Sequence, residues 1–330
     1  MKRPAVPRGT PPRQRGVALI TVLLVVALAT TAAASMTGRH QLDLRRTGNR
    51  IALAQAHEIA LGGEAWARGI LARDRRGEDG EPDTGDARRP DRDLVVDGLD
   101  EVWAGNLPPI PIEGGQVTGA ITDLQGRFNV NNLVDGGAVD AVALARFERL
   151  LEVLGIDPGV AQAVIDWIDP DGEVSYPGGA EDDYYVTLDS PYRAANRPFA
   201  SASELRTVRG IEAAAWRRLA PHVAALPRPT AINVNTASAA VLRAVVPGLE
   251  DGAGTALAEL AAEEPFTSVQ AFRRHRLVPP VDEGDANLRL GVGSSHFRVR
   301  VDVRIGDIEY TLYSWLARND NGASRVLRRV

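Results

Sequence analysis

An uncharged apolar run near the N-terminus is the longest hydrophobic feature of the chain. Val17 to Met36 carry no charge, and about 20 apolar residues are enough to cross a bilayer as a helix. Five basic residues and no acidic residue precede the run: Lys2, Arg3, Arg8, Arg13 and Arg15. This asymmetry predicts a cytoplasmic N-terminus and places residues 37–330 across the membrane. A cleaved signal peptide is the alternative, because the small residues 32–35 could form its cleavage site.

Helical periodicity continues beyond this run. Apolar residues recur along one helical face from Gln41 to Leu71, and no proline occurs between Val17 and Glu81. The pattern predicts one helix of about 55 residues, with its first half in the membrane and its second half packed on a folded domain. A membrane helix followed by a separate amphipathic helix is the alternative. Residues 77–93 mix charges with Gly and Pro, which predicts an exposed loop.

Two distant segments have the alternating pattern of strands. From Phe297 to Ile305 apolar residues alternate with charged ones, and the alternation resumes after a Gly-Asp pair and continues to Leu316. Two such runs joined by a two-residue turn predict a β-hairpin. Residues 116–130 also resemble strand, and the long helix could cover the apolar face of the resulting sheet. The predicted fold class is α+β, with residues 134–293 as a large helical insertion between strands.

The insertion contains an internal repeat. In each unit an apolar-Gly-apolar turn, centred on Gly155 or Gly248, precedes an Ala-rich helix and then a phenylalanine, Phe199 or Phe266. Such turns between short helices resemble helix-hairpin-helix and SAM-like domains. The glycines permit tight turns, which is a structural role. The functional alternative is DNA binding, because the segment Ile232–Ala237 resembles the sequence motif at the start of the helix-hairpin-helix units of competence DNA-binding proteins.

The first unit is longer than the second, and its extra residues, near 169–197, are acidic. Between Ala161 and Tyr192 there are eight acids and no Lys, Arg or His. Carboxylates at this density repel one another unless water or a cation separates them, and six to eight oxygen ligands suit Ca²⁺. The spacing is not that of an EF-hand. A calcium site and a solvated acidic loop are both consistent with this pattern.

Composition excludes several classes of function. The chain contains no Cys, so it forms neither disulfides nor thiolate metal sites, and its net charge is -5. Without the five basic residues that precede the apolar run, the net charge would be about -10, which is unfavourable for nonspecific DNA binding. The five His do not pair at metal-ligand spacing, and neither GxSxG nor HExxH occurs. We therefore do not expect an enzyme.

The junction of the basic segment and the apolar run resembles the site that prepilin peptidases cut. The resemblance implies cleavage after Gly16, with Val17 as the new N-terminus. Most such proteins have Glu as the fifth residue after the cut, whereas this chain has Thr21. Together with that departure, five motifs resemble the minor pseudopilin K family of type II secretion systems: Leu124–Leu133, Asp166–Asp171, Glu181–Tyr185, Pro191–Asn196 and Ile232–Thr236.

This resemblance implies a pseudopilin fold, in which a long transmembrane helix packs on a small antiparallel sheet, with an insertion of two SAM-like units. It implies a single-pass protein of the inner membrane with its C-terminal domain in the periplasm. There it would cap the pseudopilus tip with minor pseudopilins I and J, and through them H and the major pseudopilin, to support protein export across the outer membrane. The alternative function is a membrane-anchored helix-hairpin-helix protein for DNA uptake.

The resemblance also implies calcium in the insertion. Its ligands would be Asp169, Asp171, Glu181 and Asp182. Glu173 and Asp183 are added as candidates because they are close in the sequence, and Asp189 is a weaker candidate.

The expected domain boundaries follow from these features. They are a leader at 1–16, a transmembrane helix at 17–36, the pseudopilin helix and first strands at 37–133, helical units at 134–226 and 227–293, a β-hairpin at 294–317 and a tail at 318–330.

Overall fold

The computed structural model describes residues 17–76, 95–105, 107–227, 229–280 and 289–330. The chain divides into two units, residues 1–56 and 57–330, and each is described by itself. The predicted leader and the predicted loop at 77–93 lie outside the described residues.

The described part of the first unit is helical. Helix α1 runs from Val17 to Arg76 without a break, so the prediction of one long helix is confirmed. By length and composition α1 could cross a membrane, because an 18-residue stretch near its start has a mean hydropathy of 2.5. Four threonines in its first half, Thr21, Thr30, Thr31 and Thr37, bond within the helix. For example, Thr21 Oγ1 donates to the carbonyl oxygens of Val17 (3.1 Å) and Ala18 (2.9 Å). Such bonds satisfy hydroxyl protons that lipid cannot.

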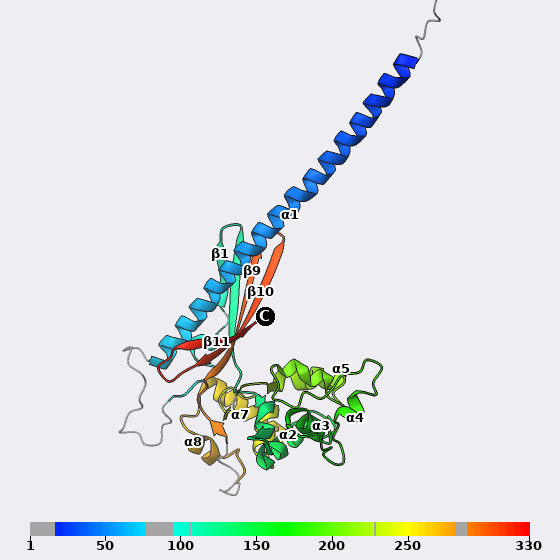
Figure 1. Ribbon diagram of the computed structural model, residues 1–330. Coiled ribbons are helices and arrows are strands. Elements are labelled where there is room, and N and C mark those ends of the chain that lie inside the picture. The colour runs from blue at the N-terminus through cyan, green and yellow to red at the C-terminus, as the bar shows by residue number, and fades with distance from the viewer. Residues whose placement is uncertain (1–16, 77–94, 106, 228, 281–288) are drawn as a thin grey trace, which may run out of the picture. The chain divides into compact units, whose positions relative to one another are not determined.

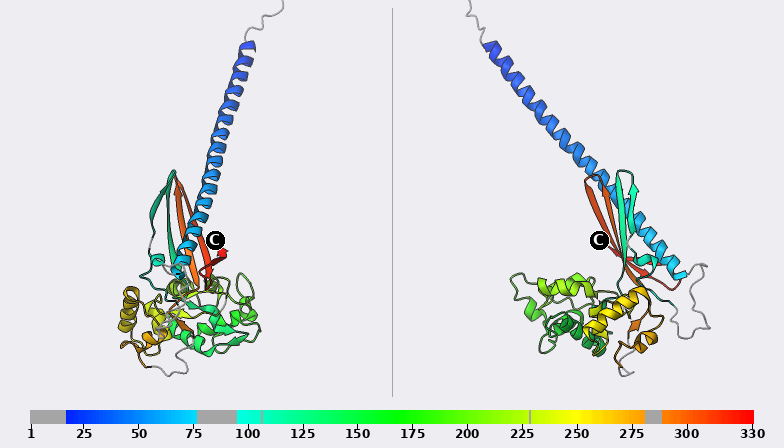
Figure 2. Two further views of the ribbon diagram at one scale, coloured as in Figure 1. Left: turned by 90° about the vertical axis from the view of Figure 1, so that its left-hand side faces the viewer. Right: turned by 180° about the vertical axis from the view of Figure 1, so that it is seen from behind.

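Five antiparallel strands form the sheet of the second unit, in the order β1-β2-β9-β10-β11 (Figures 1 and 2). They are β1 Leu107–Ile112, β2 Gly115–Asp123, β9 His296–Ile305, β10 Ile308–Arg318 and β11 Ser324–Arg329. The hairpin predicted from alternation is β9 and β10, and β9 also pairs with β2. Segments from the two ends of this unit therefore share one sheet.

The structure corrects the expectation of a tail at residues 318–330. Arg318 ends β10, and β11 follows as an edge strand that pairs with residues 314–318 of β10. Three of the six residues of β11 are Arg, and charged side chains are common on edge strands because they discourage pairing with other chains. The absence of a clear apolar alternation explains why the sequence pattern did not indicate this strand.

The second half of α1 packs on one face of the sheet (Figure 2). On the helix, Ala67 and Leu71 are buried, and on β9 the alternate residues Val299 and Val301 are buried. The two layers approach closely at Gly63, where an added Cβ would lie 2.8 Å from Val301 Cγ1. The predicted α+β class, with a long helix on an antiparallel sheet, is confirmed.

The helical insertion lies between β2 and β9 in the chain and extends from one end of the sheet (Figure 1). Its helices are α2 Ala141–Val153, α3 Val160–Ile168, α4 Asp182–Tyr185, α5 Ala213–Leu219, α6 Ala239–Val245, α7 Asp251–Glu263 and α8 Val269–Arg274. Its 3₁₀ helices are η2 Val130–Leu133, η3 Ala202–Thr207 and η4 Ala220–His222, and η1 Val102–Ala104 precedes β1. Its short strands are β3 Phe128–Asn129, β4 Val134–Asp135, β5 Ala138–Val139, β6 Val223–Ala224, β7 Ile232–Asn233 and β8 Leu290–Gly291.

Equivalent hydrogen bonds support the internal repeat. In the first repeat of the helical insertion, Asn131 accepts from the backbone N of Phe199 (2.8 Å) and donates to the carbonyl oxygen of Phe199 (3.0 Å). In the second repeat of the insertion, Asn235 makes the same two bonds with Phe266 (2.9 and 3.1 Å). Each asparagine therefore fixes, through two hydrogen bonds, the backbone of the phenylalanine at the equivalent position of its repeat. The short strands repeat as well, because β3 pairs with β6 and β7 with β8, both in parallel.

Candidate metal centre

Three acidic side chains converge at the beginning of the acidic segment. Asp169 is the C-cap of α3, Asp171 lies two residues further on, and Glu181 is the N-cap of α4. Each offers a carboxylate oxygen, and the three oxygens lie within 4.8 Å of one another. Every residue of α3 except Gln162 is buried, so packing of this helix fixes the position of the first carboxylate.

Two of these carboxylates are buried and incompletely hydrogen-bonded. Asp169 is 7% exposed and Glu181 is 3% exposed. Within the described residues, neither Asp169 Oδ1 nor Glu181 Oε1 has a hydrogen-bond partner. Buried polar atoms are nearly always paired in proteins. Two such oxygens in one cluster fit a bound cation.

The electrostatics of the cluster also fit a cation. Burial, together with the carboxylates of Asp171 and Asp166, raises the pKa of Asp169 to about 6. Burial raises the pKa of Glu181 to about 7, and the neighbouring carboxylates, that of Asp166 most strongly, contribute to the rise. Ionising both groups therefore costs free energy, which a divalent cation between them would offset. The donor set consists of carboxylates, the hard oxygen ligands that Ca²⁺ prefers.

Hydrogen bonds tie the surrounding loop to the rest of the insertion. Asp166 of α3 accepts from the backbone N of Ser175, which lies 3.1 Å from both carboxylate oxygens. Arg209 donates to the carbonyl oxygen of Gly179 (3.0 Å), and its guanidinium lies over the ring of Tyr184. These contacts hold the loop that joins Asp171 to Glu181.

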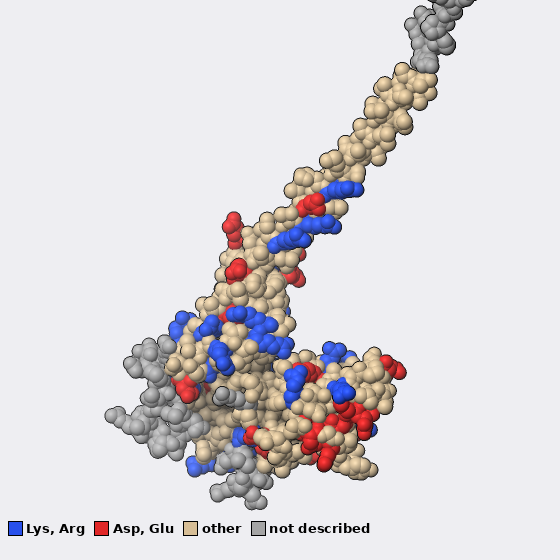
Figure 3. Space-filling view, viewed as in Figure 1, with Lys and Arg blue, Asp and Glu red and all other residues tan. Residues whose placement is uncertain are grey.

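The other three predicted ligands lie outside the cluster. Glu173 and Asp183 are exposed. Asp182 Oδ1 accepts from the backbone N of Ala194 (3.0 Å), and Asp182 Oδ2 lies 3.6 Å from the guanidinium of Arg193. Figure 3 shows acidic side chains gathered on the part of the insertion that contains α3 and α4. Three of the six predicted ligands therefore converge, and the other three do not.

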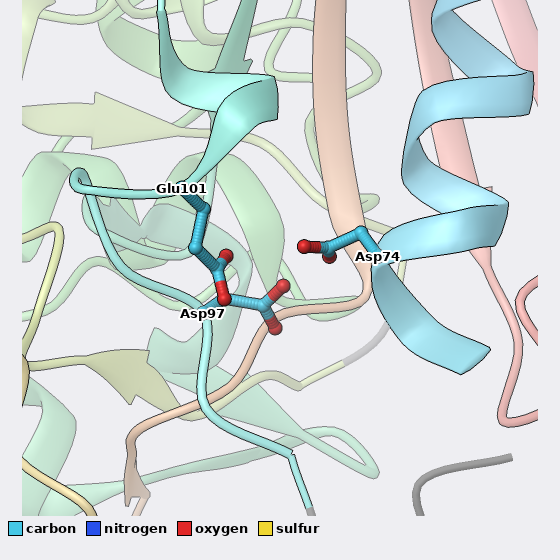
Figure 4. Close-up of side chains that lie close together, drawn as sticks. All are labelled: Asp74, Asp97 and Glu101. Atoms are coloured by element: carbon cyan, nitrogen blue, oxygen red, sulfur yellow. The ribbon is translucent and has the colours of Figure 1, made fainter. Parts of the chain in front are cut away.

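A second acidic group lies where the end of α1 meets the segment before β1 (Figure 4). Its members are Asp74, Asp97 and Glu101. Arg318 of β10 donates to Asp74 (2.7 Å) and to Asp97, which is fully buried. Asp97 also accepts from the backbone N of Ser294 (2.6 Å). Because the guanidinium supplies the balancing charge, we interpret this group as a structural ion network.

Sequence reasoning missed the polar residues that join the sheet to the insertion. Asn233 Nδ2 donates to the carbonyl oxygen of Asp97 (3.0 Å), to Asp123 Oδ2 (3.1 Å) and to Ser294 Oγ (3.0 Å). The motif Ile232–Thr236 marked Asn233 as notable. However, its partner Asp97 is 136 residues away in the chain, and a single sequence carries no signal that pairs them.

The predicted processing site lies at the limit of the described residues. Gly16 is outside them, and Val17 is the first residue of α1. Thr21 is exposed on α1.

Comparisons with known proteins give consistent results. Residues 126–228 and 232–293 match family models described as Type II secretion system (T2SS), protein K. The type II secretion system protein K of Pseudomonas aeruginosa is 38% identical over 96% of this chain and 92% of that protein. The corresponding protein of Pectobacterium carotovorum is 35% identical over 90% of each. A solved chain from the GspK-GspI-GspJ complex of enterotoxigenic Escherichia coli has a TM-score of 0.71 at 25% identity, covering 86% of this chain and 98% of that one.

A long apolar N-terminal helix, an antiparallel sheet and a helical insertion define the chain as a pseudopilin, and α1 is consistent with an anchor in the inner membrane. The chain belongs to the type II secretion system protein K family. It is a minor pseudopilin, which is a structural protein and not an enzyme. This membership replaces the DNA-uptake alternative.

Proposed function

We propose that this minor pseudopilin caps the tip of the pseudopilus. There it assembles with minor pseudopilins I and J, and through them with H and the major pseudopilin, to support export across the outer membrane. The observation that carries the proposal is the similarity to a chain of a solved complex that contains GspK, GspI and GspJ. The large helical insertion supports it, because a bulky domain would hinder another subunit from stacking above.

Thr21 is a second support for a terminal position. A carboxylate at this position of a filament subunit lies in lipid and needs a partner. The family resemblance implies that this partner is the N-terminal amine of the next subunit toward the tip. In a subunit with nothing above it, an unpaired carboxylate would cost about 2.5–3.5 kcal/mol on insertion scales. Thr21 avoids this cost, since its hydroxyl donates within its own helix.

Cysteine crosslinking tests the tip position, and the chain's lack of Cys makes single-cysteine variants unambiguous. We expect Ala18→Cys, next to the new N-terminus, to crosslink to other minor pseudopilins on one side only. Mass spectrometry of the crosslinked products identifies those neighbours, and Ala18→Ser is the matched control without a thiol. Crosslinks showing neighbours both above and below the subunit would contradict the proposal.

We further propose that prepilin peptidase removes residues 1–16. Peptidase access requires a small, flexible residue at the cut, so we expect Gly16→Leu to retain the leader. N-terminal sequencing of the wild-type protein from membranes should begin at Val17. A start near Ser35 would instead identify a cleaved signal peptide, and the anchored form would be wrong.

We propose Ca²⁺ as the ion of the metal centre, held by Asp169, Asp171 and Glu181. The proposal rests on two buried oxygens, Asp169 Oδ1 and Glu181 Oε1, that have no hydrogen-bond partner among the residues the structure describes. Calcium would hold together the two ends of the acidic loop, because Asp169 and Asp171 follow α3 whereas Glu181 precedes α4. Backbone carbonyls and water would complete the six to eight ligands that calcium requires.

We also propose that residues 134–226 and 227–293 are two SAM-like units. The equivalent hydrogen bonds between Asn131 and Phe199 and between Asn235 and Phe266 support this division. Both turn glycines have positive φ, 63° at Gly155 and 77° at Gly248, as a tight turn between helices requires.

A further inference from the structure

Arginine and aromatic side chains form a row on the face of the sheet that α1 does not cover. Residues paired directly across antiparallel strands lie on the same face, and Arg298 of β9, Trp315 of β10 and Arg328 of β11 are paired in this way. Tyr313, two residues before Trp315, shares their face. Val301 of β9 lies on the opposite face, against α1. The side chains of Arg298, Tyr313, Trp315 and Arg328, called here the arginine row, are all partly exposed.

The two arginines of this row stack on its aromatic rings. The guanidinium carbon of Arg328 lies 4.8 Å from the centre of the Trp315 ring, and that of Arg298 lies 5.7 Å from the centre of the Tyr313 ring. Stacking uses the flat face of a guanidinium group and leaves the N–H donors at its edge available for a carboxylate. The rings therefore hold two cationic donors in place on the sheet.

Neither arginine of the row is paired with an acid. Among the residues that the structure describes, Arg298 and Arg328 form no ion pair, and the hydrogen bond of the Arg328 side chain goes to the carbonyl oxygen of Ala200 (3.3 Å). Glu204, the acid beside this contact, accepts from the backbone N of Ala200 (3.0 Å). Within the same residues, Arg298 Nε is buried without a hydrogen-bond partner. Burial lowers the pKa of Arg298, as expected for a cation that loses water.

The acids on this face of the sheet belong to other arginines. Asp302 of β9 lies 2.9 Å from the guanidinium of Arg300, and Glu309 of β10 forms an ion pair with Arg304. These pairs offset the charges of Arg300 and Arg304, and the two charges of the arginine row remain. In a chain whose net charge is -5, this local excess of positive charge favours a partner that carries carboxylates.

We propose that the arginine row binds an acidic segment of a partner protein, with two carboxylates three residues apart and an apolar side chain between them. Strands β9 and β11 are two strand spacings apart, about 10 Å, and three residues of an extended segment also span about 10 Å. One carboxylate would therefore reach Arg298 and the other Arg328, with the apolar side chain next to Trp315. Trp, Tyr and Arg are the residues enriched at the centres of protein interfaces, which favours a protein over a free anion.

This binding surface goes beyond the proposed tip position. It includes neither Thr21 nor any of the proposed calcium ligands, so a negative result would leave those two proposals unchanged.

Fluorescence anisotropy with labelled peptides tests the surface on the intact, detergent-solubilised chain. The probe is Ser-Glu-Leu-Ser-Glu-Ser, and the amide control is Ser-Gln-Leu-Ser-Gln-Ser. A spacing control, Ser-Glu-Glu-Leu-Ser-Ser, has the same composition and charge as the probe but adjacent acids. We expect the probe to bind about tenfold more tightly than the amide control, because each carboxylate gains a charge-assisted hydrogen bond. The spacing control should lie between the two, since only one of its acids reaches an arginine at a time.

Paired variants separate the row from general surface charge. Arg298→Gln with Arg328→Gln should weaken binding of the probe about tenfold. The matched control is Arg217→Gln with Arg276→Gln, which removes the same charge from exposed positions on the helical insertion and should leave the affinity unchanged. If the first double variant does not fold, Arg328→Gln alone is used, because Arg328 lies on the edge strand β11.

Four results would overturn the proposal. They are equal affinity for the probe and the amide control, equal affinity for the probe and the spacing control, unchanged affinity in a folded row variant, and full displacement of the probe by inorganic phosphate at constant ionic strength. The last result would identify a site for simple anions. Heparin that bound more tightly than the probe, and lost affinity in the row variant, would identify a polysaccharide site instead and would also overturn it.

Discussion

Calcium should raise the melting temperature of the metal-free chain, and EDTA should reverse the increase. A ligand that binds only the folded state adds about 2.7 kcal/mol to the free energy of unfolding at roughly 100 times its Kd. For a folded region of this size, that corresponds to a shift of several degrees, on the order of 2–4 °C per kcal/mol. Differential scanning calorimetry in calcium and in EDTA measures the shift, and limited proteolysis of residues 169–197 reports on the loop itself.

Two carboxylate substitutions distinguish a defined centre from a diffuse acidic surface. Glu181→Gln removes a buried ligand and should abolish most of the calcium effect. Glu173→Gln removes the same charge from an exposed neighbour outside the cluster and should preserve the effect. Equal melting curves with calcium and with EDTA for the wild-type chain would contradict the metal centre. Equal loss in both variants would show that only total charge matters.

The calcium effect should depend on pH in a stated direction. Asp169 and Glu181 have pKa values of about 6 and about 7 in the folded chain, above their ordinary values of 3.8 and 4.5. Their contribution to the stability of the metal-free chain is therefore fully present below the ordinary values and is lost as pH rises through 6 to 7. Calcium must displace those protons, so its stabilising effect should be larger above pH 7 than near pH 5.

Local patterns in the sequence predicted the elements whose residues interact with close neighbours in the chain. The uncharged run predicted α1, and alternation from Phe297 to Leu316 predicted the hairpin, because both depend on a short repeat of apolar positions. The repeat also singled out Phe199 and Phe266. It did not show that Asn131 and Asn235 hydrogen-bond to the backbone of these phenylalanines. Those bonds join residues that are far apart in the chain, and the repeat gives no information on such pairs.

The same limit applies to the candidate metal centre. The sequence indicated an acidic segment, but proximity along the chain favoured Glu173 and Asp183, which are exposed in the structure. Burial of α3 turns Asp169 inward, and the loop returns Glu181 to it after twelve residues. Which carboxylates of an acidic loop converge is set by packing of the flanking helices, and residue types alone do not record it.

Replacing Arg318 with Met should be among the most destabilising single substitutions in the folded domain. Arg318 ends β10, and it donates to Asp74, to Asp97 and to the carbonyl oxygen of Ser294 (2.8 Å). The Arg318 side chain is 1% exposed and that of Asp97 is fully buried. Removing one partner of a buried ion pair leaves an uncompensated charge, at a cost of about 3–5 kcal/mol. Chemical denaturation followed by circular dichroism measures the loss.

A second substitution tests whether the cost comes from the charge left behind. Asp97→Asn combined with Arg318→Met removes both charges, so the double variant should recover part of the stability that Arg318→Met loses. Arg325→Met, on the exposed surface of β11, is the matched control and should change the free energy of unfolding by no more than about 0.5 kcal/mol. A loss for Arg318→Met as small as that of the control would show that Arg318 does not balance the charge of Asp97, and the interpretation of this acidic group as an ion network centred on Arg318 would be wrong.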